Sequence, residues 1–355
     1  MKKIVFFSKN LKIGGMEKSL VLLLNELSKK YDVTLVLEEN TGVLKNSLNT
    51  PIKVIEYTLS NDKNILLRKI KNGIKRVLWY LKYHNKYSFS CNYATYSIIG
   101  SRLAQISSKN SYLYVHSDYT KVYDTKEETL YFFSQHIVNK YKGLIFVSNE
   151  SRENFKKIMN YNSTFVINNL IDYINIIKQS NEQIDYELDN KKISFLFVGR
   201  LDNTSKNFEL LLNSFSKVNK KANLYIIGDG YYKDEIKRII KELKIQDSVF
   251  LLGEKENPYP YMKNADCLIL TSKYEGFPVV YSEALVLNKS MITTIPVSDS
   301  NINIRDYFEC VDQKNNSIIK AMKGIKKNGV KNYNVNFKKI NEININKIID
   351  LIEEE

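Results

Sequence analysis

The sequence between Cys267 and Leu287 changes from a strand pattern to a helix pattern through a short polar turn. The apolar run 267–271 precedes the turn and the helical pattern 282–287 follows it. Within this stretch lie two glutamates and three turn residues: Glu275, Gly276, Phe277, Pro278 and Glu283. A strand, turn and helix in this order form the unit of open α/β sheets, which bind ligands at the carboxyl ends of their strands. We therefore expect Glu275 on a ligand-binding loop, with Glu283 on the next helix directed toward the same loop.

Strand-like and helix-like segments alternate along the chain in two series. Apolar runs lie at 3–7, 33–37, 52–55, 112–116, 143–147 and 165–167, and again at 193–198, 224–227, 249–252, 267–270 and 291–294. This alternation is typical of α/β proteins with parallel sheets, and 355 residues are long for a single core. We expect domains at 1–170 and 193–335, joined by the polar linker 171–192, and a C-terminal helix within 336–355.

Several motifs precede the turn at Glu275 in a definite order. They are Gly14-Gly15, the Gly-Arg…Lys segment of 197–211, the strand and glycine turn of 224–230, and the strand and short helix of 249–253 and 261–266. Their order and spacing resemble those of the retaining glycosyltransferases of family 4. The resemblance covers about 195–294, and in the N-terminal half only 3–27 and the surroundings of His116. It implies the GT-B fold, in which two Rossmann-like domains face each other across a cleft. It also implies that the helix of 336–355 can cross back to the first domain.

The resemblance implies transfer of a sugar from a nucleotide-diphosphate donor, with a UDP-sugar favoured and no cofactor. Breaking the bond between sugar and diphosphate puts negative charge on the leaving group, which cations and helix N-termini can stabilise. Arg200 follows a strand and Lys206 precedes the next helix, so both can converge on the diphosphate. The resemblance assigns catalytic roles to Glu275, Arg200, Lys206 and His116.

The same resemblance assigns donor binding to a larger set of residues: Gly14, Gly15, Arg200, Lys206, Glu275, Gly276, Phe277, Pro278 and Glu283. Gly14 and Gly15 allow close backbone approach or a positive φ. The sequence has no Asp-x-Asp motif, so we expect no metal ligands and a metal-independent transfer. The resemblance implies that this transfer retains anomeric configuration. Where the family commonly has Gly-x-Pro after the second glutamate, this chain has Leu287-Asn288. Asn tolerates the left-handed conformation that ends a helix, so we expect the turn to be preserved.

The segment 63–86 contains eight Lys or Arg residues and no acidic residue, in a chain of net charge +14. Its apolar residues recur at helical spacing, which predicts a basic amphipathic helix suited to anionic lipid. The expected membrane contacts are Arg68, Lys69, Lys71, Lys75, Arg76 and Trp79. The alternative is a helix whose apolar stripe packs on the core. Nucleic acid is not an expected partner, because no RNA-binding signature accompanies the charge.

The sequence gives no run apolar enough to span a membrane and no secretory signal, so we expect a cytoplasmic protein that is peripheral on the inner face of the membrane. Its three cysteines lack disulfide or zinc spacing. The expected partners are a nucleotide sugar, a glycan or lipid-linked acceptor, and an anionic membrane surface. Four alternatives are open: a nucleotide-sugar epimerase, a phosphorylase, a glycoside hydrolase with paired carboxylates, and an inactive partner subunit. For the phosphorylase, no pyridoxal-binding lysine is evident.

Overall fold

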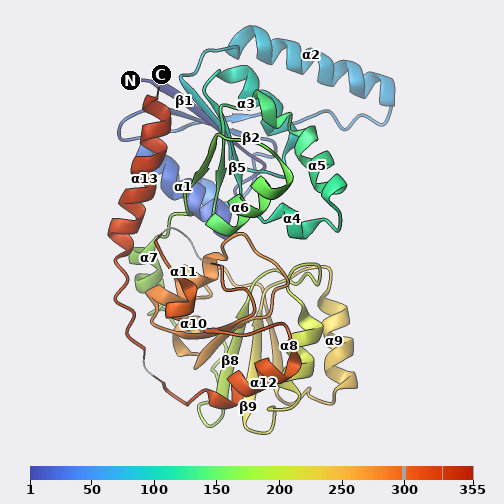
Figure 1. Ribbon diagram of the computed structural model, residues 1–355, viewed down its shortest axis with the longest axis vertical. Helices are drawn as coiled ribbons and strands as arrows, with labels where there is room; N and C mark the ends of the chain where they lie inside the picture. Colours follow the sequence, from blue (N-terminus) through green and yellow to red (C-terminus); the bar gives the residue numbers. More distant parts are fainter. Residues whose placement is uncertain (298–300, 330, 355) are drawn as a thin grey trace. The chain divides into compact units, whose positions relative to one another are not determined.

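The computed structural model describes residues 1–297, 301–329 and 331–354. The described residues leave out 298–300, 330 and 355. These positions fall within the expected ranges 193–335 and 336–355. The chain divides into two compact units: Met1–Ile171 with Lys338–Glu355 (unit 1), and Asp172–Phe337 (unit 2). Each unit is a parallel sheet with helices in the connections between its strands (Figure 1). The expected α/β fold of two Rossmann-like units is confirmed.

Unit 1 has, among its described residues, a parallel sheet in the order β3-β2-β1-β4-β5-β6-β7. This is the doubly wound order with one added strand. The strands are β1 (Lys3–Ser8), β2 (Asp32–Leu37), β3 (Lys53–Glu56), β4 (Phe89–Asn92), β5 (Ser111–Val115), β6 (Gly143–Phe146) and β7 (Thr164–Val166). The helices are α1 (Gly15–Leu27), η1 (Val43–Ser47), α2 (Ile65–Tyr83), α3 (Ile98–Ser107), α4 (Tyr119–Val122), α5 (Lys126–Gln135), η2 (Val138–Lys140), α6 (Asn149–Ile158) and α13 (Phe337–Glu353).

Strand β4 lies in the middle of this sheet although no apolar run marks it in the sequence. All four of its residues are buried, and two of them, Ser90 and Asn92, are polar. Ser90 Oγ donates to Ala104 O at 2.7 Å, and Asn92 Nδ2 donates to Ser101 Oγ at 2.9 Å. Helix α3 thus supplies partners for polar groups that would otherwise be costly to bury.

Helix α13 completes unit 1 from the far end of the sequence. Asn341 Oδ1 accepts a hydrogen bond from Ile171 N at 3.1 Å, and Lys2 Nζ lies 2.6 Å from Glu353 Oε2. The side chains of Ile348, Leu351 and Ile352 are buried. The ion pair brings the two ends of the chain together, as Figure 1 shows.

Unit 2 has, in its described part, a parallel sheet in the order β10-β9-β8-β11-β12-β13. The strands are β8 (Ile193–Val198), β9 (Ala222–Ile227), β10 (Val249–Gly253), β11 (Cys267–Leu270), β12 (Ser290–Thr293) and β13 (Glu309–Cys310). The helices are α7 (Tyr173–Gln179), α8 (Phe208–Phe215), α9 (Lys233–Glu242), α10 (Tyr259–Asn264), α11 (Val279–Val286), η3 (Ile304–Asp306) and α12 (Asn315–Gly324). The aromatic pair Phe197 and Phe208, with ring centroids 4.8 Å apart, joins β8 to α8 in the core.

The segment 171–192, expected to be a linker, is mostly part of unit 2. It contains α7, which contacts α10 and α11. Ile176 of this helix is buried, and Asn257 Nδ2 donates to Gln179 O at 3.0 Å. The segment is mostly polar, so its sequence did not predict this short helix. The contacts that hold the helix on unit 2 include one buried isoleucine and one backbone carbonyl.

Candidate functional site

The loops that follow β8 and β11 lie side by side at the carboxyl edge of the sheet in unit 2. β8 and β11 are neighbours in this sheet. Lys273 N donates to Ser205 O at 2.6 Å, and Thr271 Oγ1 donates to Lys206 O at 3.1 Å. These contacts join the two predicted motifs at the edge where open α/β sheets bind ligands.

Lys206 and Glu275 form an ion pair in these loops, through Nζ of the lysine and Oε1 of the glutamate. Ser272 Oγ donates to the same carboxylate oxygen at 2.8 Å. The lysine and glutamate side chains are only 16% and 17% exposed, so water screens their attraction less than it would at the surface. An ammonium group has three donors, and the pair with Glu275 uses one of them. The site therefore presents a positioned cation with further donors for a ligand. Ser272 was not among the expected residues.

Arg200 lies on the same loop as Lys206 but outside this pair. Its side chain is 81% exposed, and Nε lies 3.7 Å from Asp202 Oδ2. Asp202 Oδ1 accepts a hydrogen bond from Ser205 N at 3.0 Å, which fixes the loop between the two cations. Burial opposes ionisation of Asp202, but hydrogen bonds from Ser205 and Thr204 keep its pKa below the usual value. Arg200 is thus an exposed cation beside a hydrogen-bonded loop.

Gly228 allows the loop after β9 to approach the loop after β8. Its φ is +145°, and an added Cβ would lie 1.9 Å from the carbonyl oxygen of Gly199. No side chain fits between these backbones. The predicted glycine turn therefore shapes the floor of the site.

The turn Gly276-Phe277-Pro278 leads directly into α11. Pro278 is the N-cap residue and makes no side-chain capping bond, although its carbonyl oxygen accepts from Tyr281 N at 3.0 Å. Phe277 is buried and meets Tyr281 edge-on, with centroids 5.9 Å apart. The phenyl ring thus anchors the turn in the core of unit 2. At the end of the helix, Asn288 has a φ of +54°, so the expected left-handed turn is present.

Glu283 lies on α11 in a contact separate from the pair of Lys206 and Glu275. It is 8% exposed and accepts a hydrogen bond from Tyr259 Oη at 3.1 Å. Burial, and then the nearby carboxylate, raise the pKa of Tyr259 far above its usual value, so the phenol remains a donor. No sequence signal identifies Tyr259, because the contact joins two helices, α10 and α11.

Gly14, Gly15 and His116 lie in unit 1, after β1 and β5 at the carboxyl edge of its sheet. Gly14 has a φ of −170°, which any residue can adopt, so a positive φ is not the reason for this glycine. His116 stacks on Tyr114 with centroids 4.7 Å apart and meets Tyr93 at 4.6 Å. Both ring nitrogens are buried, and neither has a well-aligned hydrogen bond within the described residues. Tyr93, which follows β4, was not an expected neighbour.

Two histidines with buried ring nitrogens should make the stability of the protein depend on pH. Burial lowers the pKa of His116 to about 3, a shift that the backbone at Tyr93 opposes. Burial and then the charge of Arg102 lower the pKa of His136 to about 4. The unfolded chain binds more protons below its histidine pKa near 6.5, so the stabilisation is complete above that pH and is lost as the pH falls toward 4. We expect the free energy of unfolding to decrease by up to about 1.4 kcal/mol per pH unit for each histidine.

Urea unfolding between pH 7 and pH 5 measures this slope. His136→Gln should remove about half of it, whatever its effect on absolute stability. The third histidine, His84, is exposed, so His84→Gln is the matched control and should leave the slope as it is. An undiminished slope in His136→Gln would contradict the assignment.

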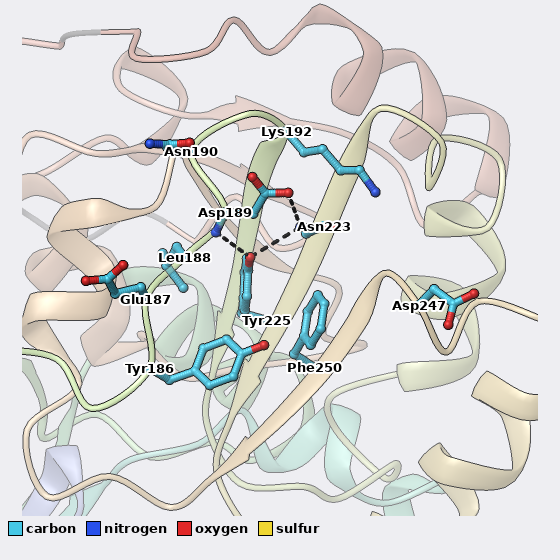
Figure 2. A pocket seen from close by; sticks show the side chains of 10 residues that line it. All are labelled: Tyr186, Glu187, Leu188, Asp189, Asn190, Lys192, Asn223, Tyr225, Asp247 and Phe250. Atoms are coloured by element: carbon cyan, nitrogen blue, oxygen red, sulfur yellow. Dashed lines mark hydrogen bonds between the residues drawn. The ribbon is translucent and has the colours of Figure 1, made fainter.

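A cavity of about 340 Å³ in unit 2 lies at the opposite, amino edge of the sheet (Figure 2). Its lining includes Lys192, Asn223 and Asp247, which stand at or just before the starts of β8, β9 and β10. Tyr225 Oη accepts from Asp189 N at 2.9 Å and from Asn223 Nδ2 at 3.3 Å, as Figure 2 shows. These bonds tie the chain before β8 to the sheet. The cavity contains none of the expected site residues.

Helix α2 presents a continuous apolar face to solvent. The aliphatic residues of this face, 48–73% exposed, are Leu66, Leu67, Ile70, Ile74, Val77, Leu78 and Leu81. At 100° per residue they occupy one side of the helix, with lysines and arginines along its borders. The alternative that this stripe packs on the core is wrong. Figure 1 shows α2 at the outer margin of unit 1.

Trp79 is on the opposite side of α2, and its expected contact with a membrane is wrong. The indole is 4% exposed and meets Tyr57 edge-on at 5.4 Å and Phe7 at 6.0 Å between centroids. Its Nε1 donates to Ser107 Oγ at 3.2 Å. The other expected contacts, Arg68, Lys69, Lys71, Lys75 and Arg76, are exposed. Trp79 therefore holds the helix on unit 1, which leaves the apolar face outward.

The described residues contain no helix of the length and apolarity needed to cross a bilayer. Within the same residues, no three His, Cys, Asp or Glu side chains are grouped as a metal-binding set.

Comparison with known proteins relates most of unit 2 to one family. Residues 178–339 match the family glycosyl transferases group 1. The chain is 37% identical over 129 residues to the N-acetylgalactosamine-N,N'-diacetylbacillosaminyl-diphospho-undecaprenol 4-alpha-N-acetylgalactosaminyltransferase of Campylobacter jejuni, covering 36% of this chain and 34% of that enzyme. It is 34% identical over 166 residues to an uncharacterised glycosyltransferase of Methanocaldococcus jannaschii, covering 44% and 40%.

The match thus spans two fifths or less of the length of these relatives. Over the whole chain, the fold resembles the crystal structure of Anabaena HepE in complex with UDP and glucose, with a TM-score of 0.75, 16% identity and coverage of 99% of this chain and 100% of that one. The similarity to the group 1 glycosyltransferases therefore lies within residues 178–339, and the two Rossmann-like units of the chain have the GT-B fold.

Proposed function

We propose that the protein is a retaining, metal-independent glycosyltransferase of family 4. It transfers a sugar from a nucleotide-diphosphate donor, a UDP-sugar by preference, to a lipid-linked glycan during assembly of cell-surface polysaccharide or glycoconjugate. The observation that carries the proposal is the ion pair of Lys206 and Glu275 beside Arg200 at the carboxyl edge of unit 2. The name of the Campylobacter relative, whose acceptor is a diphospho-undecaprenol glycan, supports the lipid-linked acceptor.

In this proposal the two cations neutralise the leaving diphosphate. Glu275 and the surrounding loop hold the ammonium of Lys206 in place, so little reorganisation is needed when charge develops on the phosphate. Arg200 is exposed and can bind two phosphate oxygens at once. The N–H groups of Val279 and Val280, to which the N-cap side chain makes no bond, offer further donors. The expected roles of Gly14, Gly15 and His116, which lie in unit 1, are those that the family resemblance implies.

The contacts of the two glutamates disfavour a glycoside hydrolase. Such an enzyme places two carboxyl groups on either side of one bond, one of them as a general acid. Here Glu275 pairs with a lysine, whereas Glu283 is buried against Tyr259. The charged pair also disfavours an inactive partner subunit. An epimerase remains the second candidate, since it would use the same donor site but would need no acceptor.

The test is a donor screen in EDTA with purified protein. UDP-, GDP- and ADP-sugars are compared by thermal shift and by nucleotide release, with and without an extract of lipid-linked glycans. We expect one UDP-sugar to stabilise the protein and release to rise with acceptor, and NMR of the product to show the donor's anomeric configuration. Conversion of the donor to an epimeric UDP-sugar, with no net release of nucleotide, would favour the epimerase, and no response to any donor would contradict the proposal.

We also propose that the protein acts on the cytoplasmic face of an anionic membrane, with α2 lying in the interface. The outward apolar face and its basic borders have the composition of interfacial helices. Lysine and arginine near an anionic surface add roughly 1 kcal/mol each. This position would keep the protein on the membrane in which a lipid-linked acceptor is embedded.

A further inference from the structure

A small cavity lies between α2, α3 and the segment that follows β3 in unit 1. Its volume is about 150 Å³, and its lining is Tyr57, Leu59, Arg76, Ile98, Ile99, Arg102 and Leu103. Liquid water takes about 30 Å³ per molecule, so the cavity has room for a group the size of a phosphate but not for an oligosaccharide. None of the residues assigned to the donor site lines it.

Two arginines in this lining lack a counter-ion. Within the described residues, neither Arg76 nor Arg102 forms an ion pair or a side-chain hydrogen bond. Both are exposed, one on α2 and the other on α3. An anion in the cavity would reduce the repulsion between two guanidinium groups, and guanidinium groups match phosphate oxygens in geometry.

Tyr57 adds a hydrogen-bonding group that has no partner in the described structure. The residue is 7% exposed, and its hydroxyl is buried without a hydrogen bond. Burial raises the pKa of this phenol, and the charge of Arg76 partly offsets the shift, so the hydroxyl remains protonated beside the guanidinium. An unsatisfied buried hydroxyl costs free energy, which a ligand oxygen would recover.

The remaining walls are aliphatic, and the cavity adjoins the helix with the outward apolar face. Leu59, Ile98, Ile99 and Leu103 complete the lining, and Ile98 is 43% exposed. We propose that this cavity binds the phosphate group of a phosphorylated lipid, with Arg76, Arg102 and the Tyr57 hydroxyl on the phosphate oxygens and the aliphatic walls against the start of the chain. The inference deepens the proposed function, since it rests on α2 lying at a membrane surface.

Two kinds of lipid carry such a phosphate group. One is an anionic phospholipid of the membrane, and the other is the phosphorylated end of a lipid-linked acceptor. Both can be tested in solution with short or soluble chains: dihexanoyl phosphatidic acid for the first and farnesyl diphosphate for the second, each below its micellar concentration, with inorganic phosphate as the third probe.

Trp79 is the only tryptophan of the chain and lies edge-on to Tyr57, so its fluorescence should report binding in the cavity. We expect both lipids to change the emission with saturation. The variant R76Q/R102Q should weaken binding at least about tenfold, because hydrogen bonds to charged groups are the stronger ones. Tyr57→Phe should weaken it about threefold or more through loss of one neutral donor. The matched control K82Q/K86Q removes two exposed charges of the same segment outside the cavity and should bind as the wild type does.

Isothermal calorimetry repeats the titration without relying on fluorescence. Tighter binding of phosphatidic acid assigns the cavity to membrane lipid, and tighter binding of farnesyl diphosphate assigns it to the acceptor. Wild-type affinity in a folded R76Q/R102Q variant, or a response to inorganic phosphate as tight as to either lipid, overturns the proposal. The donor screen tests residues of unit 2, and vesicle binding tests the apolar face of α2. If the proposed function is wrong, those two experiments fail, whereas this titration tests only the cavity.

Discussion

Lys206→Ala is expected to lower turnover with the sugar donor at least about tenfold. Removing one preorganised donor from a developing oxyanion typically costs about 100- to 1000-fold in turnover, and Arg200 on the same loop limits the loss here. The measurement is nucleotide release at saturating donor and acceptor. Donor binding should weaken less than turnover falls, because charge on the diphosphate increases as the bond breaks.

The effect of Lys206→Ala includes a second change, because the variant leaves the mostly buried carboxylate of Glu275 without its cation. Lys206→Arg keeps the charge and should retain more turnover than Lys206→Ala, whereas Glu275→Gln should retain the fold and lose the positioning of the lysine. Lys273→Ala is the matched control, because Lys273 is exposed on the neighbouring loop and should be silent. A folded Lys206→Ala protein with wild-type turnover would remove Lys206 from the phosphate site.

Replacing Ile70, Ile74 and Leu81 together by glutamine is expected to reduce binding to anionic vesicles at least about 100-fold. These side chains are 57%, 55% and 73% exposed, so the folded protein loses little packing. Burial of each such side chain in lipid is worth roughly 1.5–3 kcal/mol. Glutamine has a helix propensity close to that of leucine, so α2 should remain helical. Flotation with phosphatidylglycerol vesicles measures the binding, and thermal unfolding checks the fold.

The control removes the same number of exposed apolar side chains elsewhere: Val43, Ile174 and Ile177, which are 54%, 66% and 50% exposed. That variant should float like the wild type. Equal flotation of the α2 variant would show that the apolar face does not meet lipid. Binding by wild type that does not weaken with salt would show that the basic borders of the helix are not involved.

Much of unit 2 could be predicted from the sequence because its motifs are local. The strand, turn and helix around Glu275 lie within about 20 consecutive residues, and β11 and α11 form where the apolar runs place them. The same holds for β8 and α8 around Arg200 and Lys206. The central strand β4 could not be found in this way, because Ser90 and Asn92 break its apolar pattern and only α3 satisfies them.

The sequence by itself determined the two series of strands, the loops that carry Arg200, Lys206 and Glu275, and the basic amphipathic character of α2. These properties depend on near neighbours in the chain and on the periods of helix and strand. The tertiary structure alone decided which of them meet. Lys206 reaches Glu275 because β8 pairs with β11, and the apolar face of α2 points outward because Trp79 fills the core at Tyr57 and Phe7. A helical period defines a stripe, but only the packing of the opposite side decides where the stripe faces.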